Sequence, residues 1–205
     1  RTLRVATKGQ VYLVDAAGQK ITGALSGRIP AAFLGQIQIS DLSVDPAGLF
    51  AAPVTFHQGA VDVRLKLDPF TLDIGQLSLS EGGEHLGLSG QISADPAGWR
   101  VALDLTLNQI SRDRLLALWP LRLVTGTRNW VESNIRNADL SGLRASVRLA
   151  PGADAKTELS YGFSQAELRI MPKMPPGTGA DGYATIQGKT YTIVLSKGSI
   201  TPPEG

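Results

Sequence analysis

Apolar and polar residues alternate along most of this chain, which is the pattern of β-strands that bury one face. The clearest example is residues 61–67, where four aliphatic side chains alternate with Asp62, Arg64 and Lys66. Because turn residues separate such segments, they predict an antiparallel meander rather than βαβ units. The strands expected from clear alternation are 61–67, 101–107 and 143–149, and those from weaker alternation are 10–14, 35–40, 70–79, 86–93, 165–170, 183–187 and 190–195.

The alternation changes phase at two places. Within residues 37–44 the apolar set moves from odd to even positions. Within residues 72–79, Leu72 and Ile74 give way to Leu77 and Leu79. A strand that keeps one face buried needs a bulge or a turn at such a point. We therefore expect an irregularity in each of these two segments.

One region has helical periodicity. Ser111 is placed to cap a short helix around 112–119, which Pro120 would stop. Thr127 is placed to cap a second helix around 128–136. We expect Asn137 to form its C-cap. The tryptophans of this region, Trp119 and Trp130, are expected to anchor the helices to the sheet.

A short sequence occurs twice. Residues 43–49 and 93–99 share Asp-Pro-Ala-Gly, which is favourable for a type I turn. Two interpretations remain open: two similar hairpins, or a repeated multi-strand unit. In either case we expect one β-rich segment, with a meander over 1–107, a helical insert over 108–137 and a second meander over 138–205.

Composition narrows the class of protein. The 205 residues carry a formal net charge of only +2, and aromatic residues make up 6%. Nucleic-acid binding needs clustered positive charge and exposed aromatic side chains, so we expect no nucleic-acid partner. Hydrophobic residues at 42% are sufficient for a folded core. The lack of cysteine excludes disulfide frameworks, zinc–thiolate sites and thiol catalysis.

No apolar run approaches the ~18 residues that a membrane-spanning helix needs. The chain starts directly in strand-like sequence and ends abruptly on residues 201–205, Thr-Pro-Pro-Glu-Gly. We therefore expect a segment of a longer protein, with any export signal or anchor outside it.

Motifs that resemble catalytic or nucleotide sites lack the context those sites need. Residues 177–182 fit GxGxxG, but they precede a strand-like segment rather than a helix, so we expect a loop. Residues 188–190 resemble the end of a phosphate loop, but a hairpin turn explains them better. His57 and His85 occur singly in polar, turn-like contexts. We expect no enzyme: no catalytic residue, no cofactor and no metal ion.

The number of apolar strand faces exceeds what two short helices can cover. An apolar sheet face has to be buried against something. One solution is a closed sandwich or barrel. The other is a curved, open sheet whose apolar face holds an apolar ligand, since large exposed apolar surfaces usually mark binding sites.

A more specific signal lies in the second half of the chain. Residues 118–121, Leu-Trp-Pro-Leu, are followed by Thr-Arg-Asn-Trp-Val-Glu-Ser-Asn-Ile at 127–135. This segment resembles the "WP … R-x-W" signature of the AsmA-like superfamily, in its YhdP-like branch of bacterial envelope proteins. The matching region spans about residues 115–200, and its motif residues are Trp119, Pro120, Arg128, Trp130, Pro175, Pro176 and Gly182.

The resemblance implies a half-open, taco-like β-groove in a longer periplasmic protein that another segment anchors in the inner membrane. It implies phospholipid transport towards the outer membrane and a role in envelope integrity, without catalytic residues. Its partners would be phospholipid or another acyl lipid, neighbouring segments of the same chain and envelope proteins. Relatives include the TamB proteins, which are linked to outer-membrane protein assembly.

We therefore expect a mainly β fold, an extended, curved antiparallel sheet with two short helices, that forms part of a hydrophobic lipid conduit. The alternative is a structural or assembly module with a closed sandwich, which acts by pairing strands at an exposed edge. The residues expected to line the groove are Val61, Val63, Leu65, Leu67, Val101, Leu103, Leu105, Leu107, Leu143, Val147 and Leu149.

Overall fold

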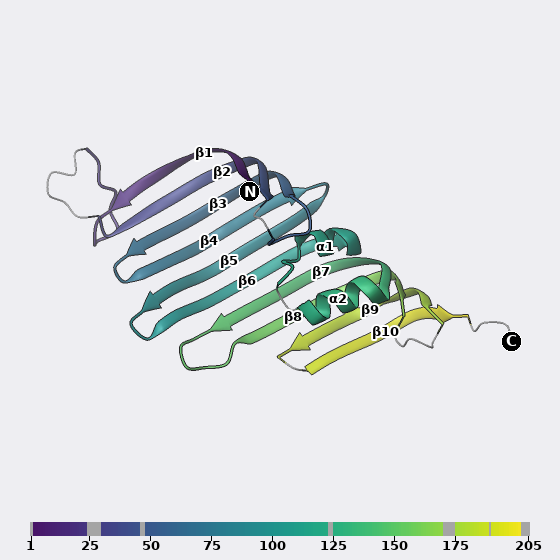
Figure 1. Ribbon diagram of the computed structural model, residues 1–205. Coiled ribbons are helices and arrows are strands. Elements are labelled where there is room, and N and C mark those ends of the chain that lie inside the picture. The colour runs from purple at the N-terminus through teal and green to yellow at the C-terminus, as the bar shows by residue number, and fades with distance from the viewer. Residues whose placement is uncertain are drawn as a thin grey trace.

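In the computed structural model, the chain forms one ten-stranded antiparallel sheet with its strands in sequence order (Figure 1). The structure describes residues 2–23, 30–45, 48–122, 125–169, 175–188 and 190–201. The strands are β1 (Thr2–Val14), β2 (Ala32–Asp45), β3 (Val54–Leu67), β4 (Phe70–Glu81), β5 (Glu84–Asp95), β6 (Gly98–Ser111), β7 (Ile135–Leu149), β8 (Lys156–Leu168), β9 (Gly177–Gln187) and β10 (Thr190–Ile200). The expected meander is confirmed.

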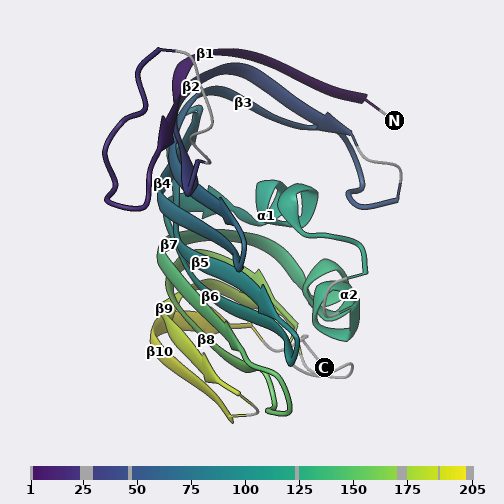
Figure 2. The same cartoon turned by 90° about the vertical axis from the view of Figure 1, so that its left-hand side faces the viewer.

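The sheet is open. Each described strand pairs only with its neighbours in sequence, so β1 and β10 form two free edges. Figure 2 shows that the sheet bends, and that both helices lie on its concave side. The closed sandwich or barrel is therefore wrong for this chain, and the curved, open sheet is confirmed. Neither helix in the described part of the chain is long and apolar enough to cross a membrane.

The pairing register separates apolar from polar side chains. Residues directly opposite each other on neighbouring strands lie on the same face of a sheet. One such row runs through Val61, Leu77, Leu88 and Leu105, across β3 to β6. The next row on the other face contains Gln36, Asp62 and Gln76. The sheet thus has an apolar, concave face and a polar face.

Both expected phase changes coincide with irregularities in the strands. In β2, Asp41 has a positive φ of 53° and no pairing partner, while Ser40 and Leu42 on either side pair with Gln58 and Phe56. In β4, the register shifts between Ile74 and Leu77. Each irregularity returns the next aliphatic residue to the apolar face, as a bulge does.

The helices are α1 (Arg112–Leu118) and α2 (Thr125–Asn134). The expected cap of α1 is confirmed, since the Ser111 Oγ accepts a hydrogen bond from the Arg114 N–H at 3.3 Å. The expected bounds of α2 are wrong at both ends. Thr127 lies inside the helix, and Asn137 belongs to β7 rather than to a C-cap. Pairing with Glu167 of β8 extends the strand into this segment.

The expected helical insert is accordingly too long. Strand β6 continues to Ser111 and β7 starts at Ile135, so residues 108–111 and 135–137 lie in the sheet.

The glycine-rich segment 177–182 is also not a loop, because it forms the first half of β9. The glycines of this segment favour a turn, but pairing with β8 on one side and β10 on the other holds it in the sheet. At Gly182 a Cβ would lie 2.0 Å from the carbonyl oxygen of Val194 and 2.7 Å from the Phe163 ring. Glycine therefore allows the close approach of three strands at this position.

The two Asp-Pro-Ala-Gly segments lie at the ends of β2 and β5. At the second, the Ala97 N–H donates to the Asp95 carboxylate at 2.8 Å. This hydrogen bond, together with Arg100, lowers the pKa of Asp95. Pro46 and Ala47 of the first segment lie outside the described residues. Because β2 and β5 are antiparallel, the turns lie at opposite ends of the sheet, which favours two similar hairpins over a stacked unit.

Candidate apolar binding surface

The apolar face consists of parallel rows of aliphatic side chains that cross the strands. The central rows of β3 to β7 pair position by position with few interruptions, and a glycine, Gly90, occupies one position. These rows comprise Leu65, Leu72, Ile92, Val101 and Leu149; Val63, Ile74, Gly90, Leu103 and Val147; and Val61, Leu77, Leu88, Leu105 and Ala145.

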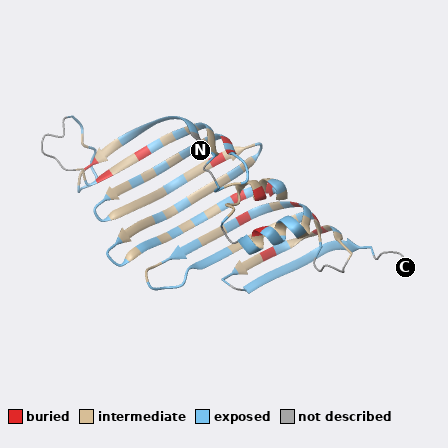
Figure 3. Cartoon of the chain, in the orientation of Figure 1, coloured by how far each residue is buried: buried red, intermediate tan, exposed pale blue. Residues whose placement is uncertain are grey.

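The helices cover one end of this face. There, Leu107, Ile110 and Leu143 form a buried cluster beneath Leu115 and Leu118 of α1. A second buried cluster, Val54, Phe56 and Leu79, also packs against Leu118. Figure 3 shows the buried positions gathered around the helices and at the start of the sheet. This end of the apolar face is the hydrophobic core of the molecule.

Arg114 fastens α1 to the sheet. Its guanidinium donates to the Thr55 carbonyl oxygen of β3 at 2.7 Å and to the Glu84 carboxylate of β5 at 3.2 Å. It also lies over the Phe56 ring, 5.5 Å from the ring centroid. This guanidinium therefore joins α1 to two strands that are not adjacent in the sheet.

Two further arginines join the helices to each other. Arg112 of α1 donates to the Glu132 carbonyl oxygen of α2 at 2.7 Å. Arg128 of α2 donates to the Glu132 carboxylate at 2.9 Å and to the Leu116 carbonyl oxygen of α1 at 3.5 Å. Arg128 is the buried residue of α2, with 7% of its surface exposed, whereas Trp130 is 44% exposed. The buried contact of α2 is therefore this arginine rather than the expected tryptophan. Trp119 lies half-buried directly after α1.

At the other end of the apolar face, no helix or strand of the described part of the chain lies over the sheet. We call this region the uncovered apolar surface, and its side chains are half-buried or exposed although they lie in the middle of the sheet. Leu149 and Val147 are each 39% exposed. The residues of this surface are Val61, Val63, Leu65, Leu72, Ile74, Leu88, Ile92, Val101, Leu103, Val147 and Leu149.

The structure divides the residues expected to line a groove into two groups. Val61, Val63, Leu65, Val101, Leu103, Val147 and Leu149 lie on the uncovered apolar surface, and half-buried Leu105 lies at its border with the core. Leu107 and Leu143 are core residues beneath α1, so we correct their assignment to the groove. Leu67 lies at the end of β3 and is 63% exposed.

Sequence reasoning missed an aromatic pair at the far end of this surface. Phe70 and Trp99 meet edge to face, with ring centroids 5.6 Å apart. Phe70 and Trp99 lie two residues before Leu72 and Val101, which belong to the same aliphatic row. Trp99 remains exposed. The sequence did contain a signal for this pair. Phe70 continues the even-numbered apolar positions of β4, and Trp99 continues the odd-numbered apolar positions of β6.

The polar face holds several carboxylates at the polar positions of the alternating strands. Asp62 and Asp104 are exposed there, and Asp73 is half-buried. Asp73 accepts a hydrogen bond from Gln91 at 2.6 Å, and Asp104 accepts one from Arg148 at 2.6 Å. Within the described residues, no three His, Asp or Glu side chains are grouped so as to hold a metal ion.

Both histidines lie in strands rather than in turns. His85 Nδ1 lies 2.9 Å from the Ser80 Oγ. The Glu81 carboxylate accepts hydrogen bonds from the His57 ring and from its backbone N–H. The hydrogen bond between these side chains raises the pKa of His57 and lowers the pKa of Glu81.

The His57–Glu81 pair predicts a pH dependence. The contribution of His57 to stability is complete below pH 6.5, its ordinary pKa, and is lost as the pH rises through the raised folded pKa. The contribution of Glu81 is lost as the pH falls through its own lowered pKa. In an NMR titration, we expect His57 to titrate above pH 6.5 and to return towards that value in Glu81→Gln. An unchanged His57 titration in that variant would contradict the pairing.

The edge strand β10 is more exposed than the strands in the interior of the sheet. All residues of β10 are exposed, including the large apolar residues Tyr191, Ile193, Val194 and Leu195. Strand β10 contains no proline, and Lys197 is its only charged residue. Such an edge has few of the features that prevent pairing with another strand.

No protein-family model, curated protein or solved structure matches this chain.

Proposed function

We propose that the uncovered apolar surface binds the acyl chains of phospholipid. The observation that carries this proposal is that rows of aliphatic side chains remain accessible on the concave face of an open sheet, beside a core that the helices do cover. Large exposed apolar surfaces on proteins usually mark a binding site.

The energetics favour an apolar ligand. Each methylene group that leaves water contributes about 0.8 kcal/mol, so two acyl chains of about 15 carbons each gain on the order of 25 kcal/mol when fully buried. The ligand needs no polar recognition on this face, since the rows contain only aliphatic residues and glycine. Binding therefore requires no catalytic group.

The dimensions also fit. Neighbouring strands lie about 4.8 Å apart, so the five strands from β3 to β7 present a surface about 20 Å wide. One leaflet of a bilayer contributes about 15 Å of hydrocarbon. A single acyl chain can therefore lie on this surface in contact with aliphatic side chains along its length.

The resemblance to AsmA-like proteins of the YhdP-like branch gives this binding a biological setting. We propose a periplasmic segment of an inner-membrane-anchored protein that carries phospholipid between the inner and outer membranes and supports envelope integrity. Segments of this kind would place their apolar surfaces side by side, so that lipid moves along them without contact with water. The motif residue Arg128 would then serve to hold the helices together rather than to bind lipid.

A second candidate function is a scaffold for envelope assembly that acts through an exposed edge strand. The observation in its favour is the fully exposed β10. Replacing Val194 with Lys adds a charge at this edge, which should prevent strand pairing. In the scaffold, this variant loses its protein partner; in the lipid conduit, it binds lipid as the wild type does.

Native mass spectrometry of the protein purified without detergent tests the proposal. We expect the protein to carry mass that corresponds to acyl lipid, and phospholipid to be recovered by solvent extraction. A lipid-free monomer would contradict the proposal. A lipid-free dimer would also contradict it, because a second copy would then cover the apolar surface.

A further inference from the structure

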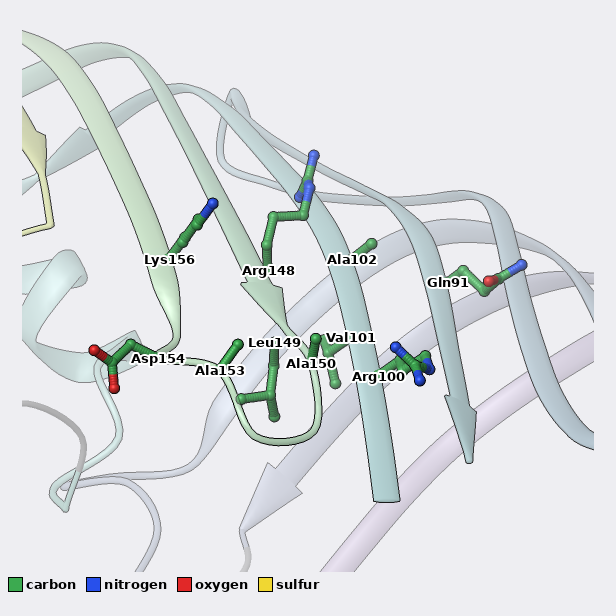
Figure 4. Close-up of a pocket in the computed structure, with 10 residues that line it drawn as sticks. All are labelled: Gln91, Arg100, Val101, Ala102, Arg148, Leu149, Ala150, Ala153, Asp154 and Lys156. Atoms are coloured by element: carbon green, nitrogen blue, oxygen red, sulfur yellow. The ribbon is translucent and has the colours of Figure 1, made fainter. Parts of the chain in front are cut away.

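A cationic pocket lies where the polar face meets the open end of the uncovered apolar surface (Figure 4). We call it the rim pocket. Its volume is about 330 Å³, within the range of small-ligand sites. The lining residues that matter here are Arg100, Val101, Arg148, Leu149, Asp154 and Lys156.

The strand register brings three cations together. Arg148 and Lys156 are directly opposite each other on β7 and β8. Arg148 is also opposite Ala102 of β6, two residues from Arg100. Directly opposite side chains have Cβ atoms about 5 Å apart, and diagonal neighbours about 7–8 Å. Like charges directly opposite each other, such as Arg148 and Lys156, destabilise a sheet, so an anion between them would be stabilising.

Some N–H groups of these three cations have no hydrogen-bond acceptor among the described residues. Arg148 donates to Asp104 and to the carbonyl oxygens of Leu103 and Val147. Arg100 contacts Asp95 through its Nε at 3.2 Å. Among the described residues, the Lys156 ammonium has no hydrogen-bonded or ion-paired partner. Figure 4 shows the Asp154 carboxylate directed away from the two arginines.

In three other hollows of the polar face, the cations do not outnumber the carboxylates. Lys8 shares one with Asp62, and Arg144 shares another with Asp104 and Glu158. A third contains two cations and two carboxylates. The rim pocket is lined by three cations and one carboxylate. Because Asp95 and Asp104 pair with Arg100 and Arg148 from outside this lining, Lys156 is the cation left to attract an anion.

The rim pocket also adjoins the surface proposed to bind acyl chains. Val101 and Leu149 line it and belong to the uncovered apolar surface as well. Arg100 and Arg148 are their neighbours in sequence and lie on the opposite face, because side chains alternate along a strand. The turns that follow β5 and β7 end the sheet here. A lipid that occupied both sites would have to pass around these turns.

We propose that the rim pocket binds a phosphate-class anion, namely the headgroup of a phospholipid whose acyl chains lie on the uncovered apolar surface. This inference rests on the proposed function. Lys156 and the terminal nitrogens of Arg100 contact the phosphate oxygens, as ammonium and guanidinium groups commonly do. Arg148 remains paired with Asp104.

The test compares two lipids with the same acyl chains, phosphatidylglycerol and diacylglycerol, which lacks phosphate. We expect the wild-type protein to bind phosphatidylglycerol about tenfold more tightly, as one charge-assisted contact predicts. Lys156→Gln and Arg100→Gln should reduce this preference and leave diacylglycerol binding unchanged. Lys8→Gln is the matched control, since it removes the same charge from the polar face in a hollow away from the rim.

Three other results would overturn the headgroup proposal, and they differ in what they say about acyl-chain binding. Equal binding of the two lipids by the wild type overturns the rim pocket and leaves the acyl-binding function standing. Failure to bind either lipid overturns both. A third measurement tests binding of inorganic phosphate. If the wild type binds phosphate, Lys156→Gln does not, and the wild type shows no preference between the two lipids, the pocket binds free anions. That result overturns the headgroup assignment. Circular dichroism of each variant confirms that the sheet is intact.

Discussion

Replacing Val61 with Asp is expected to reduce acyl-lipid binding by about tenfold or more, because a bound chain would cover an unpaired carboxylate. Val61 lies near the middle of β3, between Ile37 and Leu77 on the neighbouring strands. In the lipid-free protein this side chain is only half-buried, so the new carboxylate keeps contact with water. The measurement is the dissociation constant of a fluorescent phospholipid.

The preceding residue provides the matched control. Ala60 is exposed on the polar face, so Ala60→Asp adds the same charge to the same strand on the opposite side. We expect its lipid affinity to stay within about twofold of the wild type, since the change lies away from the apolar face. Equal losses in the two variants would contradict the assignment of lipid to one face.

Replacing Leu107 with Ala is expected to lower the free energy of unfolding by about 2–5 kcal/mol, as for other buried leucines. Leu107 is 5% exposed and packs in the cluster beneath α1. Leu149, on the uncovered apolar surface, is 39% exposed. Its replacement by Ala should cost about 1 kcal/mol or less, because water already reaches the site.

Urea unfolding of the two variants measures this difference. For lipid affinity we expect the opposite order: Leu149→Ala should lose more affinity for lipid than Leu107→Ala. Comparable stability losses would mean that both ends of the apolar face are covered to the same extent. That result would remove the distinction between the core and the binding surface.

The alternation of residue types predicted the two faces of the sheet, because side-chain direction depends only on odd or even position within a strand. The phase changes in β2 and β4 likewise revealed two irregularities, since only such a feature keeps Leu42 and Leu77 on the apolar face. These properties are local, and sequence reasoning is reliable for them.

Other features depend on contacts between distant residues. Asn137 has the local character of a helix cap, but pairing with β8 draws it into β7. The glycines of β9 suggested a loop because sequence alone does not show that Val194 and Phe163 approach Gly182. Likewise, an arginine is expected to be exposed, and only the helix pair explains why Arg128 is buried.

The division of the apolar face into core and binding surface was also beyond sequence reasoning. Leu103 and Leu107 belong to the same phase of β6, yet only Leu107 lies beneath α1. The position of the helices depends on Arg114, which reaches Thr55 and Glu84 from a different part of the chain. An open sheet and a closed one have the same alternation, so the pattern left both possible.

Photo-cross-linking with a phospholipid that carries a diazirine in its acyl chain tests the central claim most directly. After illumination, peptide mass spectrometry locates the modified residues. We expect adducts on the uncovered apolar surface, at positions such as Leu65, Leu72 and Val101. Adducts confined to the polar face, or the absence of adducts from a protein that retains its fold, would contradict it.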